Sequence, residues 1–190
     1  MGFPKALLPL GQRTFLTCIL DTLESLDLAQ PRVVLGSHAE RIRPLLLSRD
    51  ARVLINPDPA QGQLSSIKLA LRDVEASSTA CLIWPVDQPA VPGTVVRDLI
   101  RLFETTGAPI TLPVYQERRG HPGLFNRSVF AELLAAPLNE GARTVVLKYR
   151  DEIALLPTTE LATVLDVDTA EDYRRLTGET LESALKRGRQ

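Results

Sequence analysis

The sequence contains few aromatic residues, cysteines and histidines, and each shortage excludes a class of core or site. Aromatic residues make up 5% of the 190 residues, so the core has to be built mainly from Leu, Val, Ile and Ala. Cys18 and Cys81 each lie in an apolar run, which predicts reduced core thiols of a cytosolic protein and argues against a disulfide. Because His38 and His121 are the only histidines, a metal centre built from histidine and cysteine is not expected.

The sequence also lacks an excess of charge and a long apolar run. Lys and Arg number 22 against 23 acidic residues, so no overall field collects nucleic acid or membrane, and an anionic ligand needs a local site. No apolar run reaches the roughly 20 residues of a membrane span. Residues 1–11 show no continuous apolar stretch typical of a signal peptide. We therefore expect a cytoplasmic protein that binds neither nucleic acid nor membrane.

The composition that remains is typical of one globular domain. Hydrophobic residues make up 44% and charged residues 24% of the chain. A chain of this length can bury a sizeable core, and it shows no internal repeat, low-complexity tract or linker. We therefore expect a single domain over residues 1–190.

Short apolar runs alternate with segments of helical periodicity through the first two-thirds of the chain. This alternation predicts an α/β fold of three layers, with helices on both faces of a mostly parallel, Rossmann-like sheet and a short antiparallel addition after Pro109. Strands are predicted at Arg32–Gly36, Arg52–Ile55, Ala80–Trp84, Pro109–Val114, Leu124–Phe125, Ile153–Leu156 and Ala162–Val167. Helices are predicted at Thr14–Leu28, His38–Leu47, Ser65–Val74, Val95–Phe103, Ser128–Leu134, Ala142–Tyr149 and, as the last helix, after a cap at Thr169.

Polar segments follow three of the predicted strands. They are Asn56-Pro57 with Gly62-Gln63-Leu64-Ser65-Ser66, Val86-Asp87-Gln88-Pro89, and Asp166-Val167-Asp168-Thr169. In an open α/β sheet, ligands bind outside the carboxyl ends of the strands. A helix start can bind phosphate and carboxylates can bind a divalent cation, so together the segments favour a phosphorylated ligand with a metal ion. Taken singly, a serine pair before a helix is more often a cap, Asp-Gln-Pro after a strand is usually a turn, and Asp168-Thr169 can be a capping pair.

The order and spacing of these segments resemble one family. Phe3-Pro4-Lys5-Ala6-Leu7-Leu8-Pro9-Leu10, the three segments above and Gly120-His121-Pro122 together are similar to the MobA-like NTP transferases, and most similar to the molybdenum cofactor cytidylyltransferase (MocA) branch. The resemblance extends over nearly the whole chain. It implies a fold like that of the nucleotide-diphospho-sugar transferases. The activity it implies is transfer of CMP from CTP, in preference to GMP from GTP, to a phosphorylated acceptor such as molybdopterin, with release of pyrophosphate.

The resemblance also implies roles for individual residues, with positioning and charge neutralisation providing most of the catalysis and no protein nucleophile. Lys5 and Asp87 would be catalytic, Lys5 by holding the triphosphate and the leaving pyrophosphate. The nucleotide would be bound by Lys5, Asn56, Gly62, Ser65 and Ser66. Magnesium would be bound by Asp87 together with Asp166 or Asp168. Gly120, His121 and Pro122 would border the acceptor pocket, and a molybdoenzyme or its chaperone would be a further partner.

The sequence departs from the family pattern in two places. The family carries a strand and a Leu-Ala-Ala-Gly-type loop before the Met-Gly that aligns with Met1-Gly2, about 15 residues in all with a strand of about 5–6. Without that strand, the predicted strands Arg32–Gly36 and Ala80–Trp84 are expected to have unpaired edges. We then expect either a lower stability of the protein or pairing of these edges with another chain. Val86 stands where the family often has Gly.

Two other functions are alternatives for this fold. A non-catalytic nucleotide-binding or regulatory module would keep the fold and bind nucleotide without turnover. A dehydrogenase-like dinucleotide binder would need Gly-x-Gly-x-x-Gly after a strand, and the sequence has no such motif.

Overall fold

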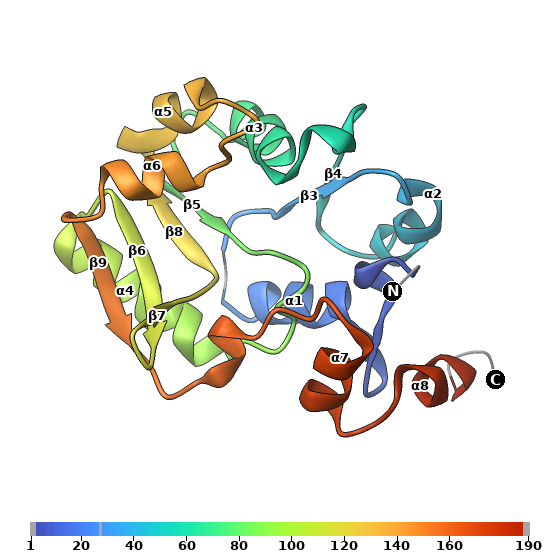
Figure 1. Cartoon of the computed structure of the whole chain (residues 1–190). Coiled ribbons are helices and arrows are strands. Elements are labelled where there is room, and N and C mark those ends of the chain that lie inside the picture. The colour runs from blue at the N-terminus through green and yellow to red at the C-terminus, as the bar shows by residue number, and fades with distance from the viewer. Residues whose placement is uncertain (1–2, 27, 188–190) are drawn as a thin grey trace.

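The computed structural model describes residues 3–26 and 28–187 and has helices and strands in alternation (Figure 1). The strands are β1 (Pro9–Leu10), β2 (Arg13–Thr14), β3 (Arg32–Leu35), β4 (Arg52–Ile55), β5 (Ala80–Ile83), β6 (Ile110–Tyr115), β7 (Arg118–Arg119), β8 (Gly123–Asn126) and β9 (Ile153–Pro157). The helices are α1 (Phe15–Glu24), α2 (Ala39–Ile42), α3 (Gln63–Asp73), α4 (Gly93–Thr106), α5 (Phe130–Ala135), α6 (Arg143–Lys148), α7 (Ala170–Thr177) and α8 (Leu181–Arg187). Short 3-10 turns lie at Lys5–Leu7, Arg43–Leu46, Pro59–Gln61, Arg127–Val129 and Leu161–Val164.

The main strands are mostly parallel, as predicted. β3 pairs in parallel with β4, and β6 pairs in parallel with β9. β8 lies between β5 and β6 and runs antiparallel to both, so β5 and β6 share one direction. Arg32 at the start of β3 contacts Asp73, the last residue of the helix that precedes β5. Leu35 at the end of β3 packs in one cluster with Val86, which follows β5. β3 and β5 therefore run in the same direction. β8 and the short β7 are the antiparallel addition.

Helices cover both faces of the sheet (Figure 1). On one face, α3, α5 and α6 pack on β6 and β8 around a core that includes Leu71, Leu112 and Leu133. On the other face, α4 packs on β9 through Leu99 and Leu156, and α1 lies beside the start of α4. This is the predicted three-layer arrangement. None of the described helices is long and apolar enough to cross a membrane.

Several helix ends differ from the sequence-based prediction. Thr14 caps α1 through a reciprocal capping box with Thr17, as its position predicts, but the helix ends at Glu24 instead of Leu28. The predicted helix end includes Asp27, which lies outside the described residues. α3 starts at Gln63, two residues early, so that the two serines lie in its first turn and Gly62 is the N-cap.

The predicted strand at Ala162–Val167 is wrong. Residues Leu161–Val164 form a 3-10 turn, in which the Thr163 hydroxyl donates to the Glu160 carbonyl at 2.8 Å. The Val167 N–H then donates to the carbonyl oxygen of Asp87 at 3.0 Å, so the segment is held by a loop and has no strand partner among the described residues. A short apolar run is ambiguous from periodicity alone, and here contacts with two loops decide its structure. α7, capped by Thr169, is also not the last helix, because α8 follows it.

Candidate active site

Lys5 lies between two carboxylates that come from distant parts of the chain. It starts a 3-10 turn after Pro4, and its Nζ donates to Asp87 Oδ2 at 3.0 Å and to Asp168 Oδ1. Asp87 follows β5, and Asp168 directly precedes Thr169, the N-cap of α7. The fold therefore brings together three of the residues that the sequence assigned to triphosphate and metal binding.

The electrostatics of this cluster favour a charged lysine. Partial burial disfavours the ammonium form, but hydrogen bonds to Asp168 and Asp87 outweigh it, so the pKa of Lys5 is raised above its usual value. The side chains of Lys5 and Asp87 are 28% and 27% exposed, whereas that of Asp168 is 65% exposed. Solvent therefore reaches the cluster, and a ligand can too.

The same cluster bears on metal binding. The carboxylates of Asp87 and Asp168 both contact the Lys5 ammonium group. The position between them therefore stabilises a positive charge. Among the described residues, no group of three or more His, Cys, Asp or Glu side chains is arranged around a common metal position. Magnesium often takes only one or two protein carboxylates and completes its shell with water and substrate phosphates, so Asp87 and Asp168 fit such an ion.

Asp166 points to a different partner. Its Oδ1 accepts a hydrogen bond from Gln88 Nε2 at 2.6 Å. Gln88 is 2% exposed, and its Oε1 has no hydrogen-bond partner among the described residues. The sequence-based reasoning missed Gln88, although its place directly after Asp87 was a signal. Between the two candidate acids, the structure places Asp168 beside Lys5 and Asp87, and places Asp166 beside Gln88.

A second polar group forms where β4 ends and α3 begins. Asn56 is 6% exposed, and its Nδ2 donates to Ser65 Oγ at 2.8 Å and to Ser66 Oγ at 3.0 Å. Its Oδ1 accepts the backbone N–H of Asp58 at 3.0 Å. Gly62 has a φ of +86°, a conformation that other residues adopt only with strain. The amide of Asn56 thus orients both serine hydroxyls in the first turn of α3, at the positive end of the helix dipole.

Gly120 and His121 are held tightly against the 3-10 turn at Thr163. The N–H of His121 donates to the Thr163 carbonyl at 2.8 Å, and that of Gly120 to the Pro113 carbonyl at 2.8 Å. A Cβ atom on Gly120 would lie 2.2 Å from the Thr163 carbonyl oxygen, so only glycine fits. The peptide bond between His121 and Pro122 is cis.

His121 connects this loop electrostatically to the acidic residues. Its Nδ1 is buried and has no hydrogen-bond partner among the described residues. Burial lowers its pKa, and the charges of Asp166 and Asp87 offset only part of that effect, so the imidazole is neutral near pH 7. The three loops that carry Asp87, His121 and Asp166 therefore border one region.

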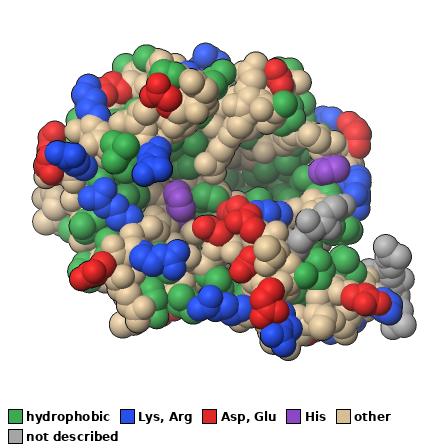
Figure 2. Space-filling view, in the orientation of Figure 1, with side chains coloured by type: hydrophobic (Ala, Val, Ile, Leu, Met, Phe, Trp, Pro, Cys, Tyr) green, Lys and Arg blue, Asp and Glu red, His purple; other side chains and the backbone are tan. Residues whose placement is uncertain are grey.

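A hollow connects the residue groups. Figure 2 shows a depression in one face of the molecule, with hydrophobic side chains inside it and acidic and basic side chains along its rim. Ser66 and Val86 are among the residues that line a cavity of about 550 Å³. The first turns of α3 and the residue before Asp87 therefore border the same cavity. Val86 also packs in a cluster with Ala6 and Leu35.

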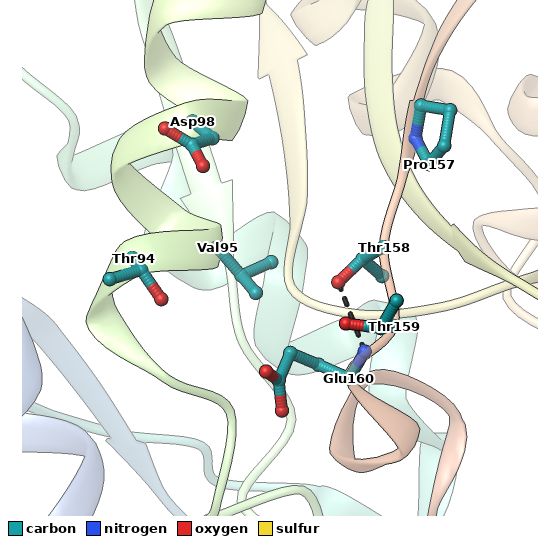
Figure 3. A pocket seen from close by; sticks show the side chains of 7 residues that line it. All are labelled: Thr94, Val95, Asp98, Pro157, Thr158, Thr159 and Glu160. Carbon is teal, nitrogen blue, oxygen red and sulfur yellow. Dashed lines mark hydrogen bonds between the residues drawn. The ribbon is translucent and has the colours of Figure 1, made fainter.

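A second pocket contains none of the predicted site residues. It measures about 420 Å³ and lies between α4 and the chain after β9, with Asp98 and Glu160 on its walls (Figure 3). The Glu160 N–H donates to Thr158 Oγ1 at 3.1 Å across its floor. This pocket is therefore separate from the residues that the motifs singled out.

Comparisons with known proteins agree with the fold and motifs. The curated relatives include the molybdenum cofactor cytidylyltransferase of Escherichia coli K12, 27% identical over 91% of this chain and 86% of that protein. They also include the nicotine blue oxidoreductase of Paenarthrobacter nicotinovorans, 26% identical over 91% of this chain and 87% of that protein. Among solved structures, Rv0371c of Mycobacterium tuberculosis H37Rv superposes with a TM-score of 0.84 at 30% identity, over 94% of this chain and 91% of that one.

A further structure of Rv0371c is a complex with manganese, with a TM-score of 0.82. The family described as MobA-like NTP transferase domain matches residues 1–153. The resemblance predicted from the motifs is thereby confirmed, and the chain belongs to the MobA-like NTP transferase family.

Proposed function

We propose that this protein transfers CMP from CTP to a phosphorylated acceptor such as molybdopterin, with release of pyrophosphate and with magnesium as the metal ion. Membership of the family supports nucleotidyl transfer in general. The choice of CTP and of a pterin acceptor rests on the motifs shared with the cytidylyltransferase branch and on the relative of that name.

The observation that carries the proposal is the cluster of Lys5, Asp87 and Asp168. One cation and two carboxylates, drawn from three segments distant in the sequence, suit a triphosphate that arrives with its metal ion, and Asp87 among them lies just after the carboxyl end of β5. When bound, magnesium would supply charge neutralisation at the phosphates, held by Asp87 and Asp168. Lys5 would exchange its contact with the carboxylates for one with the triphosphate.

The reaction would be an in-line displacement. An oxygen of the acceptor phosphate attacks the α-phosphorus of CTP, the bond from that phosphorus to the oxygen bridging to the β-phosphate breaks, and pyrophosphate leaves. Lys5 would stabilise the charge that develops on the leaving pyrophosphate. Asn56 would hold Ser65 and Ser66 toward the nucleotide, with Gly62 allowing a close backbone approach. The proposed reaction needs no proton transfer to His121, whose imidazole is neutral. Gly120, His121 and Pro122 would instead shape the acceptor pocket.

Nucleotide binding tests the site directly. Asp87→Asn should weaken magnesium-dependent CTP binding by about tenfold or more, because one of two carboxylate ligands is lost. Asp98→Asn, in the pocket of Figure 3, is the matched control and should bind like the parent protein. The measurement is calorimetry with CTP, with and without magnesium. Unchanged CTP affinity in Asp87→Asn, with the circular dichroism spectrum retained, would refute the metal role.

The role of Lys5 in turnover is tested separately. Lys5→Ala should lower kcat by about 100-fold with a smaller rise in KM, because its contact with the leaving group strengthens in the transition state. Lys186→Ala, on the exposed surface of α8, is the control. If only KM changes, Lys5 serves in binding alone.

Two rival functions are separated by the products. A non-catalytic nucleotide-binding module would bind CTP but release no pyrophosphate. The relative named nicotine blue oxidoreductase makes hydride transfer the second rival, although the sequence has no Gly-x-Gly-x-x-Gly motif. Pyrophosphate release that requires both CTP and acceptor supports the proposal, whereas oxidation or reduction of nicotine blue without pyrophosphate release contradicts it.

We also propose a partner protein for the product. A molybdoenzyme or its chaperone would receive the product from this protein in the cytoplasm. Co-purification of the protein with an apo-molybdoenzyme from the same organism, set against a purification with Lys5→Ala, tests that step.

A further inference from the structure

The loop after β5 is fixed at Gln88, the residue next to Asp87. The Gln88 N–H donates to the Pro85 carbonyl at 3.3 Å, which closes a turn of which Asp87 is part. The Gln88 carbonyl accepts a hydrogen bond from Trp84 Nε1 at 2.9 Å, and Trp84 packs against the apolar cluster at the start of α4. The backbone that carries Asp87 is therefore attached to a packed part of the molecule.

The side chain of Gln88 reaches a second loop, the one that precedes α7. Its Nε2 donates to Asp166 Oδ1 at 2.6 Å. An ionised carboxylate only accepts hydrogen bonds, so Asp166 fixes the orientation of the amide, with the nitrogen toward the carboxylate. In the same two loops, the Val167 N–H donates to the Asp87 carbonyl at 3.0 Å. One side-chain and one backbone hydrogen bond thus join the loop of Asp87 to that of Asp166.

Asp168 has a different partner from Asp166, which lies two residues before it. Its carboxylate contacts Lys5, and no other side chain among the described residues bonds to it. When Lys5 turns to a triphosphate, the Asp168 carboxylate loses that contact and is left near the like charge of Asp87. A second attachment, independent of Lys5, is then needed to keep the two carboxylates together until the metal ion is bound.

We propose that Gln88 and Asp166 are positioning residues, which hold Asp87 and Asp168 at the spacing that a metal ion requires. This role rests on the proposed function, in which those two carboxylates bind magnesium and Lys5 binds the triphosphate. Magnesium demands nearly ideal octahedral geometry, and residues that orient its ligands affect its affinity strongly. Asp166 thereby serves the site through its hydrogen bond with Gln88 and binds no metal itself.

The burial of Gln88 allows its hydrogen bond to be separated from its packing. Gln88 is 2% exposed, and its Oε1 has no hydrogen-bond partner among the described residues. Burial of that unpaired oxygen costs stability. A methionine is a flexible apolar side chain of similar length that fills the same space without this cost. Gln88→Met therefore removes the hydrogen bond to Asp166 and keeps the packing of the loop.

The test compares variants that break the hydrogen bond with one that keeps it. Gln88→Met and Asp166→Ala break it, whereas Asp166→Asn keeps an acceptor oxygen for Gln88 Nε2. Calorimetry measures the affinity for CTP with and without magnesium. Each breaking variant should lose about tenfold in magnesium-dependent CTP affinity and keep the parent affinity for CTP alone. Asp166→Asn should stay within about threefold of the parent protein, because Asp166 is exposed and solvent screens its charge.

A double variant and a remote variant are the controls. The double variant Gln88→Met/Asp166→Ala should bind CTP with magnesium no more weakly than either single variant, because all three lack the same hydrogen bond. Gln30→Met removes a hydrogen bond of the same kind, from Gln30 Nε2 to Asp50. These two residues precede β3 and β4, at the opposite ends of the strands from Asp87, so Gln30→Met should bind like the parent protein.

Hydrogen exchange at Val167 is a measurement that needs neither metal nor turnover. The Val167 N–H bonds to the Asp87 carbonyl in the same pair of loops that Gln88 joins. Without the side-chain hydrogen bond these loops should separate more often, so exchange at Val167 should become about tenfold faster in Gln88→Met. Exchange at Val167 in Gln30→Met should match that of the parent protein.

The outcomes separate this role from the proposed function. If the parent protein and Gln88→Met bind CTP equally well with magnesium, the positioning role is overturned and the proposed function stands. If Asp166→Asn loses as much affinity as Asp166→Ala, Asp166 acts through its charge or as a metal ligand, which also overturns the positioning role. A parent protein whose CTP binding does not depend on magnesium would overturn both, and faster exchange at Val167 in Gln88→Met would then show a structural hydrogen bond only.

Discussion

Strands β5 and β6 are both apolar and both lie between helix layers, yet their burial differs. β6 is paired along both edges, with β8 and β9, and Ile110 and Leu112 on it are 0% and 5% exposed. Within the part of the chain that the structure describes, β5 is paired along one edge, and all four of its residues are half-buried. The comparison shows that helices above and below a strand do not suffice to bury it. A neighbour along each edge is needed as well.

The loops follow the same division. On the β6 side, Gly120 and His121 are fixed by backbone hydrogen bonds to Pro113 and Thr163. On the β3 side, Ser65 and Ser66 are held by the amide side chain of Asn56, and Ser66 lines the cavity of about 550 Å³. The loops of the two regions are thus held by different means, backbone hydrogen bonds in one and a side-chain amide in the other.

The largest expected effect comes from shortening one isoleucine in each region. Ile110→Ala, in the closed core, should lower the free energy of unfolding by about 2–5 kcal/mol, because it leaves a cavity among well-packed neighbours. Ile83→Ala should lower the free energy of unfolding by about 1 kcal/mol, because that side chain already borders the cavity of about 550 Å³. Urea denaturation of both variants measures the difference, and equal losses would break the comparison.

Much of this local structure could be predicted from the sequence, and the pairing of strands could not. β4 matches the predicted range, and the cap at Thr14 was predicted because a cap depends on residues three positions apart. The insertion of β8 between β5 and β6 depends on pairs that are distant in the sequence, such as Ala80 with Asn126 and Ile110 with Phe125. Periodicity holds no information on such contacts, and the same limit explains the wrong strand at Ala162–Val167.

The candidate site shows the same limit. Motifs identified Lys5, Asp87 and Asp168 through a resemblance, but their meeting point and the contact of Asp166 with Gln88 needed the fold. The cavity of about 550 Å³ and its apolar walls came from the structure alone.

An intermediate effect is expected from adding one methyl group to a glycine in each region. Gly120→Ala should destabilise the protein by about 1–3 kcal/mol, because the new Cβ collides with the rigid Thr163 backbone. In Gly93→Ala, where α4 starts beside α1, the new Cβ would lie 3.3 Å from the Thr22 methyl and 3.9 Å from Ser25 Oγ, both side-chain atoms, so the stability should change little. Thermal denaturation of the pair is the measurement. A larger loss for Gly93→Ala would mean that α1 and α4 pack more rigidly than the loop of Gly120.

The smallest effect is the pH dependence contributed by His121. Burial lowers its pKa in the folded protein, so the unfolded chain binds more protons below about pH 6.5. Its contribution to stability is therefore complete above that pH and is lost as the pH falls toward the lowered pKa, by at most about 1.4 kcal/mol per pH unit. His121→Gln should flatten this slope. Urea denaturation between about pH 5.5 and 7.5 decides it, and identical slopes in the parent and His121→Gln would contradict the assignment.

The proposed transfer of a nucleotide is tested most directly by following its phosphorus atoms. CTP labelled in the α-phosphate and CTP labelled in the γ-phosphate are each incubated with protein, magnesium and a molybdopterin-type acceptor. Nucleotidyl transfer predicts that the α label appears on the acceptor and the γ label leaves as pyrophosphate, with both signals lost in Asp87→Asn and retained in Asp98→Asn. Appearance of the γ label on the acceptor, or retention of both labels in intact CTP, would contradict the proposed function.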